Sequence, residues 1–144
     1  EGFGGRTIAF DDPVEGGYKS AMDYLPPCLM SHDPLDLVIV MLGTNDTKQR
    51  FAMSAPAIAQ ALAHLVRLCR LYAADARGEP ARVLIISPPP VRTEVLKTRM
   101  AGTFDTRSVA LTRAAGGLST GSAWGCYFAP TCSPLADLSQ LSVV

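Results

Sequence analysis

The tetrapeptide Gly43-Thr44-Asn45-Asp46 is the stretch of this sequence whose residue types and spacing could do chemistry. An asparagine amide can donate hydrogen bonds to an oxygen that becomes negatively charged during a reaction, and a glycine lets the backbone approach a ligand closely. An ordinary turn is the competing interpretation, because Gly, Asn and Asp are all favoured in turns. The tetrapeptide alone does not separate the two interpretations.

The run that precedes the tetrapeptide predicts a β-strand over Leu35–Leu42. Its eight residues, LDLVIVML, are nearly all apolar and are β-branched in the middle, which is typical of a strand covered on both faces in a parallel sheet. Ligands of open parallel sheets bind at the carboxyl ends of the strands. The tetrapeptide occupies that end of the predicted strand.

Helical periodicity follows the tetrapeptide. Ser54 is a candidate N-cap for a helix that runs to about Ala74. The apolar residues of this helix share one face, with His64 and Arg67 on the opposite face; they are Ile58, Leu62, Leu65, Val66, Cys69 and Tyr72. The sequence therefore predicts an amphipathic helix between the first strand and the next one.

The remaining chain predicts further elements in alternating order. Residues 1–20 indicate a long loop, and residues 21–32 indicate a short piece, interrupted by proline, that is either helical or irregular. The later elements are a second buried strand, a weaker helical stretch and a third strand, expected at 82–87, 94–115 and 123–128. This order favours an α/β fold with a parallel sheet and right-handed crossovers.

Composition limits the classes of partner. The chain has 144 residues, 48% of them hydrophobic, and 13 basic against 13 acidic side chains, which fits one globular domain and argues against a nucleic-acid or anionic-membrane surface. No apolar run approaches the ~18 residues of a membrane span. The four cysteines contain no CxxC pair, so they favour a reducing, cytoplasmic compartment over secretion, although Cys126 and Cys132 could be bridged. No glycine-rich phosphate loop or zinc spacing is present, and we expect no cofactor and no metal.

Five segments, taken together, resemble the SGNH hydrolases, also called GDSL-type esterases. They occur in the order GFGGRT, DDP, YLPPCL, PLDLVIVMLGTNDTK and VLIISPPP, which begin at Gly2, Asp11, Tyr24, Pro34 and Val83. The nearest likeness is to the bacterial arylesterase and acyltransferase branch. It is most specific over Pro34–Lys48 and becomes loose beyond Pro90.

This resemblance implies a flavodoxin-like three-layer α/β/α fold and cleavage of acyl or aryl esters through an acyl-serine. It assigns Gly5, just before Arg6, and Asn45 to the oxyanion hole. For Asp46 we favour a structural role, in which its carboxylate holds the turn by accepting backbone N–H bonds. Arg6 is expected either to pair with Asp11 or Asp12 or to remain a solvated charge.

Two catalytic blocks of the family have no match in the 144 residues. The nucleophilic serine should lie in a Gly-Asp-Ser motif upstream, and no serine here follows Gly-Asp. The Asp-x-x-His block should lie near the carboxyl terminus, yet Asp137 is followed by Leu-Ser-Gln. His32 precedes the amino end of a strand and His64 faces water, so neither is suited to act as the general base.

The expected organisation is thus a partial SGNH hydrolase domain over residues 1–128 and a divergent tail over 129–144. The first strands and the C-terminal helix of the fold would be missing, and the true start of the chain too, since it begins with Glu1. The chain by itself would be inactive. Its strand over Leu35–Leu42 would become an exposed apolar edge, which predicts poor solubility or partial unfolding.

The competing function is a non-catalytic flavodoxin-like module that binds a carboxylate or an acyl group. For the esterase, the expected partner is a small-molecule ester, with a homo-oligomer also compatible. The acyl preference and the oligomeric state do not follow from the sequence.

Overall fold

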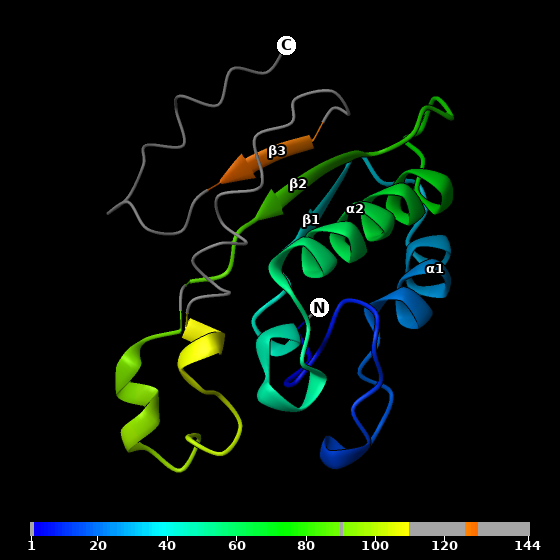
Figure 1. Cartoon of the computed structure of the whole chain (residues 1–144). Helices are drawn as coiled ribbons and strands as arrows, with labels where there is room; N and C mark the ends of the chain where they lie inside the picture. The colour runs from blue at the N-terminus through cyan, green and yellow to red at the C-terminus, as the bar shows by residue number, and fades with distance from the viewer. Residues whose placement is uncertain (1, 90, 110–125, 130–144) are drawn as a thin grey trace.

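The computed structural model describes residues 2–89, 91–109 and 126–129 (Figure 1). Two α-helices, α1 (Ala21–Ser31) and α2 (Ala55–Tyr72), accompany three strands, β1 (Leu37–Val40), β2 (Arg82–Ile86) and β3 (Cys126–Ala129). Short 3₁₀ helices lie in the connections; they are η1 (Pro13–Glu15), η2 (Asn45–Thr47), η3 (Gln49–Phe51) and η4 (Thr93–Lys97).

The three strands form one parallel sheet in the order β1-β2-β3. Val38 pairs with Val83, and Leu84 pairs with Tyr127. Helix α2 makes the crossover from β1 to β2, which is the βαβ unit that parallel pairing requires. The α/β fold with a parallel sheet is therefore confirmed, with strands slightly shorter than the apolar runs that predicted them.

Both long helices begin at a serine cap. The Ser54 side chain accepts a hydrogen bond from the Ala57 N–H at 3.4 Å, as the sequence predicted, and α2 then runs to Tyr72, slightly short of the predicted end near Ala74. Ser20 caps α1 in the same way. Helix α1 continues through Pro26 and Pro27 over 11 residues, so the segment that could have been irregular is helical.

The core lies between the sheet and these two helices. Val38 and Val40 of β1 pack in one cluster with Val83 of β2, Leu29 of α1 and Leu65 of α2. Leu65 is fully buried and Val83 nearly so. Because alternate residues of a strand point to opposite faces, this cluster defines the covered face of the sheet.

The opposite face of β1 is open, and here the prediction of a strand covered on both faces is wrong. Leu37, Ile39 and Met41 are 43%, 59% and 55% exposed. The reason is that β1 is an edge strand in the described sheet and that α1 and α2 both pack on the Val38 and Val40 side. The described residues thus build two layers of a three-layer arrangement.

The stretch expected as a weak helix over 94–115 is interrupted. Helix η4 covers Thr93–Lys97, and residues 106–109 are helical again after a turn that contains Gly102. The Asp105 carboxylate accepts a hydrogen bond from the Ser108 N–H at 2.8 Å and so caps this second start. Residues 110–115, and the tail expected after residue 129, lie outside the described residues. Within the described part of the chain, no helix has the length and apolar character needed to cross a bilayer.

Candidate active site

Asn45 lies at the carboxyl end of β1, where the chain turns into η2. The turn is made by Gly43, which is buried and has a φ of +121°, a backbone angle that favours glycine. The Asn45 amide Nδ2 donates a hydrogen bond to the Arg6 carbonyl oxygen at 2.9 Å. This bond connects the loop after β1 to the N-terminal loop, although the two residues are 39 positions apart.

Gly5 is the residue before Arg6, whose carbonyl oxygen accepts the hydrogen bond from Asn45. Its φ is +81°, and a Cβ at this position would collide with Glu15 Oε2 and lie 3.3 Å from Lys19 Cε. Among the hydrogen bonds of the described residues, the Gly5 N–H donates to no acceptor. The Arg6 carbonyl accepts only one of the two Asn45 amide hydrogens. The second Asn45 amide hydrogen and the Gly5 N–H are therefore two donors in adjacent segments.

Asp46 is fully buried directly beside Asn45. Its Oδ1 accepts a hydrogen bond from the Ile8 N–H at 2.9 Å, whereas Oδ2 has no partner among the described residues. Burial raises the pKa of the Asp46 carboxyl to about 6, opposed by the Ile8 hydrogen bond and the charge of Lys48. The prediction that this carboxylate accepts a backbone N–H is confirmed, but the donor is Ile8 of the N-terminal loop and not a residue of the turn itself.

An ion cluster fixes the other side of the same loop. Asp12 is fully buried and accepts hydrogen bonds from Arg50 Nε at 3.0 Å and Nη2 at 2.5 Å, and from Lys48 Nζ at 3.2 Å. Lys48 Nζ also donates to Glu15 Oε1 at 2.6 Å. Arg50, and to a lesser extent Lys48, lower the pKa of Asp12 to about 2. The η1 loop is thereby held against the chain that follows Asn45.

Arg6 takes neither of the positions expected from the sequence. Its guanidinium carbon lies 4.7 Å from the centre of the Phe3 ring and 4.3 Å from that of Tyr24. Asp12 is bonded instead by Lys48 and Arg50. Among the described residues, Arg6 is therefore an ion-pair partner of neither Asp11 nor Asp12, and it is not a freely solvated charge, because the two rings offer it a cation–π site.

Solved structures of esterases are similar to this chain over most of its length. The aryl esterase of M. smegmatis is 33% identical, with a TM-score of 0.74, over 90% of this chain and 61% of that chain. Est24, a carbohydrate acetylesterase from Sinorhizobium meliloti, is 32% identical, with a TM-score of 0.65, over 90% of this chain and 61% of that chain. No protein-family model matches the chain, and no curated protein matches it.

The chain is similar to arylesterases and carbohydrate acetylesterases, which are SGNH hydrolase-like. It spans about three fifths of the length of the solved esterases that it matches. Those esterases share its α/β architecture, which is flavodoxin-like.

Both histidines of the chain are exposed. His64 is exposed on α2, and His32 is exposed at the end of α1, where its Nδ1 lies 2.8 Å from the Cys28 carbonyl oxygen. His32 precedes β1 and Asn45 follows it, so the two lie toward opposite ends of the strand. The prediction that neither histidine serves the site agrees with these positions.

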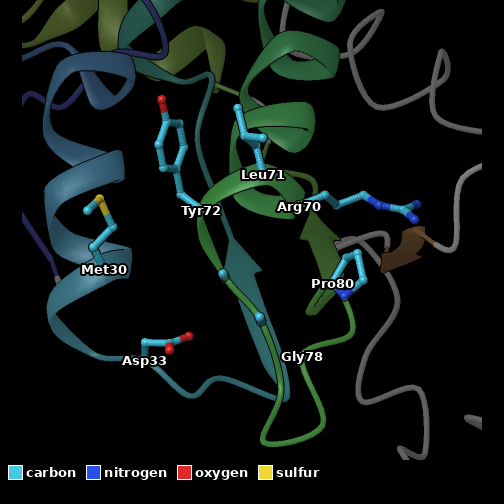
Figure 2. A pocket seen from close by; sticks show the side chains of 9 residues that line it. Met30, Asp33, Arg70, Leu71, Tyr72, Gly78 and Pro80 are labelled. Atoms are coloured by element: carbon cyan, nitrogen blue, oxygen red, sulfur yellow. The ribbon is translucent and has the colours of Figure 1, made fainter.

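A hollow of 540 Å³ lies at the end of the sheet opposite to Asn45 (Figure 2). Met30 of α1, Leu71 and Tyr72 of α2, and Gly78 and Pro80 of the following loop are among the residues that line it. These residues precede the strands β1 and β2, whereas Asn45 follows β1. The hollow is therefore separate from the candidate site.

Residues 103–108 also support the Asn45 loop, and the sequence analysis did not predict this contact. Ser108 is fully buried, and its hydroxyl donates to the Thr47 carbonyl oxygen at 2.6 Å. The Gln49 N–H donates to the Thr103 carbonyl at 2.9 Å. Nothing in the local pattern of residues 103–108 marks them as partners of a loop more than fifty positions earlier; the polar residues beside Gly102 were the only available signal.

Proposed function

We propose that this chain carries the oxyanion-binding part of a serine-type carboxylic ester hydrolase. One observation carries the proposal: the Asn45 amide lies against the carbonyl of the residue that follows Gly5, at the carboxyl end of β1. The matched aryl esterase and carbohydrate acetylesterase support the same reaction class. The substrate would be a small ester, with an aryl or a sugar leaving group, as the names of those two enzymes indicate.

In this reaction a serine oxygen attacks the ester carbonyl carbon, and the carbonyl oxygen becomes an oxyanion. The Gly5 N–H and the second Asn45 amide hydrogen would donate to that oxygen. Because the donors are fixed before the charge develops, they stabilise the transition state more than the ground state. Collapse of the intermediate expels the alcohol and leaves an acyl-serine, which water then hydrolyses.

The buried residues around the donors would hold them in place. Asn45 is held through Arg6, Asp46 is held through Ile8, and the Asp12 cluster fixes the chain after Thr47. Each of these contacts joins the N-terminal loop to the loop after β1. The donor geometry would therefore depend on the connection between the two loops.

The nucleophile and the general base would come from outside the residues matched here, since no Gly-Asp-Ser and no Asp-x-x-His occurs in the 144 residues. We expect the 144-residue polypeptide alone to show no ester turnover. Loss of the nucleophile or base in a serine hydrolase costs on the order of a millionfold in kcat.

The experiment joins this chain to the segments of the M. smegmatis aryl esterase that lie outside the matched 61% of that protein. The chimera should hydrolyse p-nitrophenyl acetate, and Asn45→Ala should lower kcat by about 10²–10³-fold, as removal of one oxyanion donor does elsewhere. Gln60→Ala, a change on the exposed side of α2, is the matched control and should leave kcat unchanged. A folded chimera with no turnover of any p-nitrophenyl ester would refute the proposal.

The alternative is a module that only binds a carboxylate or an acyl group. It would be favoured by a rise in melting temperature of the 144-residue chain with acetate that disappears in Asn45→Ala, together with an inactive but folded chimera.

A further inference from the structure

Lys19 is a buried cation beside the peptide that joins Gly4 to Gly5. It is only 9% exposed, although lysine is rarely buried without a partner. Lys19 Nζ donates a hydrogen bond to the Gly4 carbonyl oxygen at 2.9 Å and lies 4.2 Å from the centre of the Phe3 ring. No salt bridge among the described residues includes Lys19. The ammonium is therefore held against the peptide that carries the Gly5 N–H.

The backbone of Lys19 is itself fixed. Its N–H donates to Asp11 Oδ1 at 2.7 Å, and its carbonyl oxygen accepts a hydrogen bond from the Thr7 N–H at 3.0 Å. The next residue, Ser20, is the N-cap of α1. The side chain of Lys19 thus reaches Gly4 from an anchored point of the chain, 15 positions further on.

Residues 3–6 form a tight turn whose central peptide is the one between Gly4 and Gly5. The Arg6 N–H donates to the Phe3 carbonyl oxygen at 3.1 Å, and the φ of Gly5 is +81°, as at the third residue of a type II turn. In a type I turn this φ is about −90°, and the central peptide is rotated by about half a turn. Glycine tolerates either sign of φ, and a Cβ at Gly4 would meet nothing within 4 Å. The two glycines alone therefore do not choose between the two forms.

The hydrogen bond from Lys19 favours one form. The Gly4 C=O and the Gly5 N–H belong to one planar trans peptide and point in opposite directions. While Lys19 Nζ holds the carbonyl oxygen, the Gly5 N–H points away from the ammonium, and rotation of the peptide would break the bond and reverse the N–H. A hydrogen bond from a charged donor is stronger than a neutral one. It also polarises the peptide, which makes the Gly5 N–H a better donor.

We propose that Lys19 is a positioning residue, which fixes the direction of the Gly5 N–H through its hydrogen bond to the Gly4 carbonyl oxygen. This inference rests on the proposed role of Gly5 as an oxyanion donor. The Phe3 ring supports the arrangement, because Lys19 Nζ and the guanidinium carbon of Arg6 lie 4.2 Å and 4.7 Å from its centre. One ring thus holds the cation that binds the peptide before Gly5 and the residue that follows it.

Nuclear Overhauser effects report the form of the turn in the 144-residue chain, or in the chimera described above if the chain is insoluble alone. A type II turn gives a strong effect between Gly4 Hα and the Gly5 N–H, and a type I turn gives one between the two N–H groups. Lys19→Met should change the first pattern into a mixture of both. The order parameter of the Gly5 N–H should fall from about 0.85 to below about 0.6, whereas the Ile8 N–H, bonded to Asp46, should remain near 0.85.

Two further variants complete this measurement. Lys97→Met makes the same substitution at an exposed site and should leave the turn unchanged. Lys19→Arg should keep the type II pattern, because the guanidinium also donates to a carbonyl oxygen. Three results would overturn the proposal: an unchanged turn in Lys19→Met, a loss of order at Ile8 together with Gly5, or an equal effect of Lys97→Met.

Turnover of the chimera is the second measurement. Lys19→Met should lower kcat for p-nitrophenyl acetate about tenfold with KM unchanged, because the Gly5 donor acts on charge that develops only in the transition state. Lys19→Arg should restore most of the loss. An unchanged kcat in a chimera that Asn45→Ala impairs would overturn the proposal. A folded chimera without turnover would instead refute the proposed function, and the form of the turn would still decide whether Lys19 orients the Gly5 N–H.

Discussion

The Asp46 carboxylate and the Ile8 N–H form a hydrogen bond of 2.9 Å between two fully buried residues that are 38 positions apart. The neighbouring Asn45 amide bonds the Arg6 carbonyl. The consecutive side chains of Asn45 and Asp46 therefore bond the N-terminal loop at Arg6 and at Ile8. This pair of bonds gives the loop after β1 a fixed position relative to Gly5.

The Asp46 carboxyl should make stability depend on pH near neutrality. Its pKa is about 6 in the folded chain against 3.8 for an unperturbed aspartate. A raised folded pKa means that the stabilisation is fully present below about 3.8 and is lost as pH rises through 6. The free energy of unfolding should thus increase by about 1 kcal/mol from pH 8 to pH 5.

Urea denaturation at pH 8 and pH 5 measures this effect. Asp46→Asn should abolish the increase, since the amide does not titrate, whereas Asp36→Asn, at an exposed site, should preserve it. An unchanged pH dependence in Asp46→Asn would contradict the assignment.

Removal of the Asp12 charge should destabilise the chain strongly. Asp12 is fully buried between Lys48 and Arg50, so Asp12→Asn leaves two cations without their central partner. The expected cost is about 3 kcal/mol, as for other broken buried pairs. Arg77→Ala removes the Asp75–Arg77 pair, in which Arg77 is 83% exposed, and should cost less than about 1 kcal/mol. If urea denaturation gave the same loss of stability for both variants, burial of Asp12 would not explain the cost of removing its charge.

The same carboxylate should contribute to acid denaturation. The pKa of Asp12 falls from 3.8 to about 2 on folding, so its contribution is present above 3.8 and is lost as pH falls through 2. The unchanged chain should lose about 2 kcal/mol over this window from Asp12. Measured from pH 4 to pH 2, the loss should be smaller in Asp12→Asn than in Arg77→Ala.

Gly5→Ala should cost about 1–2 kcal/mol, because its φ of +81° is unfavourable for alanine and its Cβ would displace Glu15, whose Oε1 is held by Lys48. Gly4→Ala is the control, since a Cβ there meets nothing within 4 Å; it should be neutral or slightly stabilising. Thermal melts of the two variants decide the matter. Equal melting temperatures would mean that the loop around Gly5 is not fixed as described.

Ser108→Ala should leave the Thr47 carbonyl without its hydroxyl donor. For a buried acceptor, the expected loss is about 1–3 kcal/mol. Thr98→Ala removes a similar hydroxyl-to-carbonyl bond, to Val95, at an exposed site and should change stability by less than about 0.5 kcal/mol. Urea denaturation compares them, and a small effect of Ser108→Ala would show that residues 103–108 do not support the Asn45 loop.

The sequence by itself determined the elements of this chain. Continuous apolar runs predicted β1 and β2, a helical period predicted α2, and Ser54 marked the start of α2, because these signals depend only on neighbouring residues. The motifs around Gly5 and Asn45 also indicated the esterase family. Their functional roles are still predictions, supported by the Asn45–Arg6 contact.

Only the tertiary structure decided which charges pair and which faces are covered. Asp12 and Lys48 are 36 positions apart, and no local pattern relates them, so Arg6 was an equally plausible partner of Asp12 until the loops were placed. The exposure of Ile39 has the same origin. The sequence shows that Ile39 is apolar and favours its burial. Whether a layer covers it depends on where the helices pack, and here both pack on the side of Val38 and Val40.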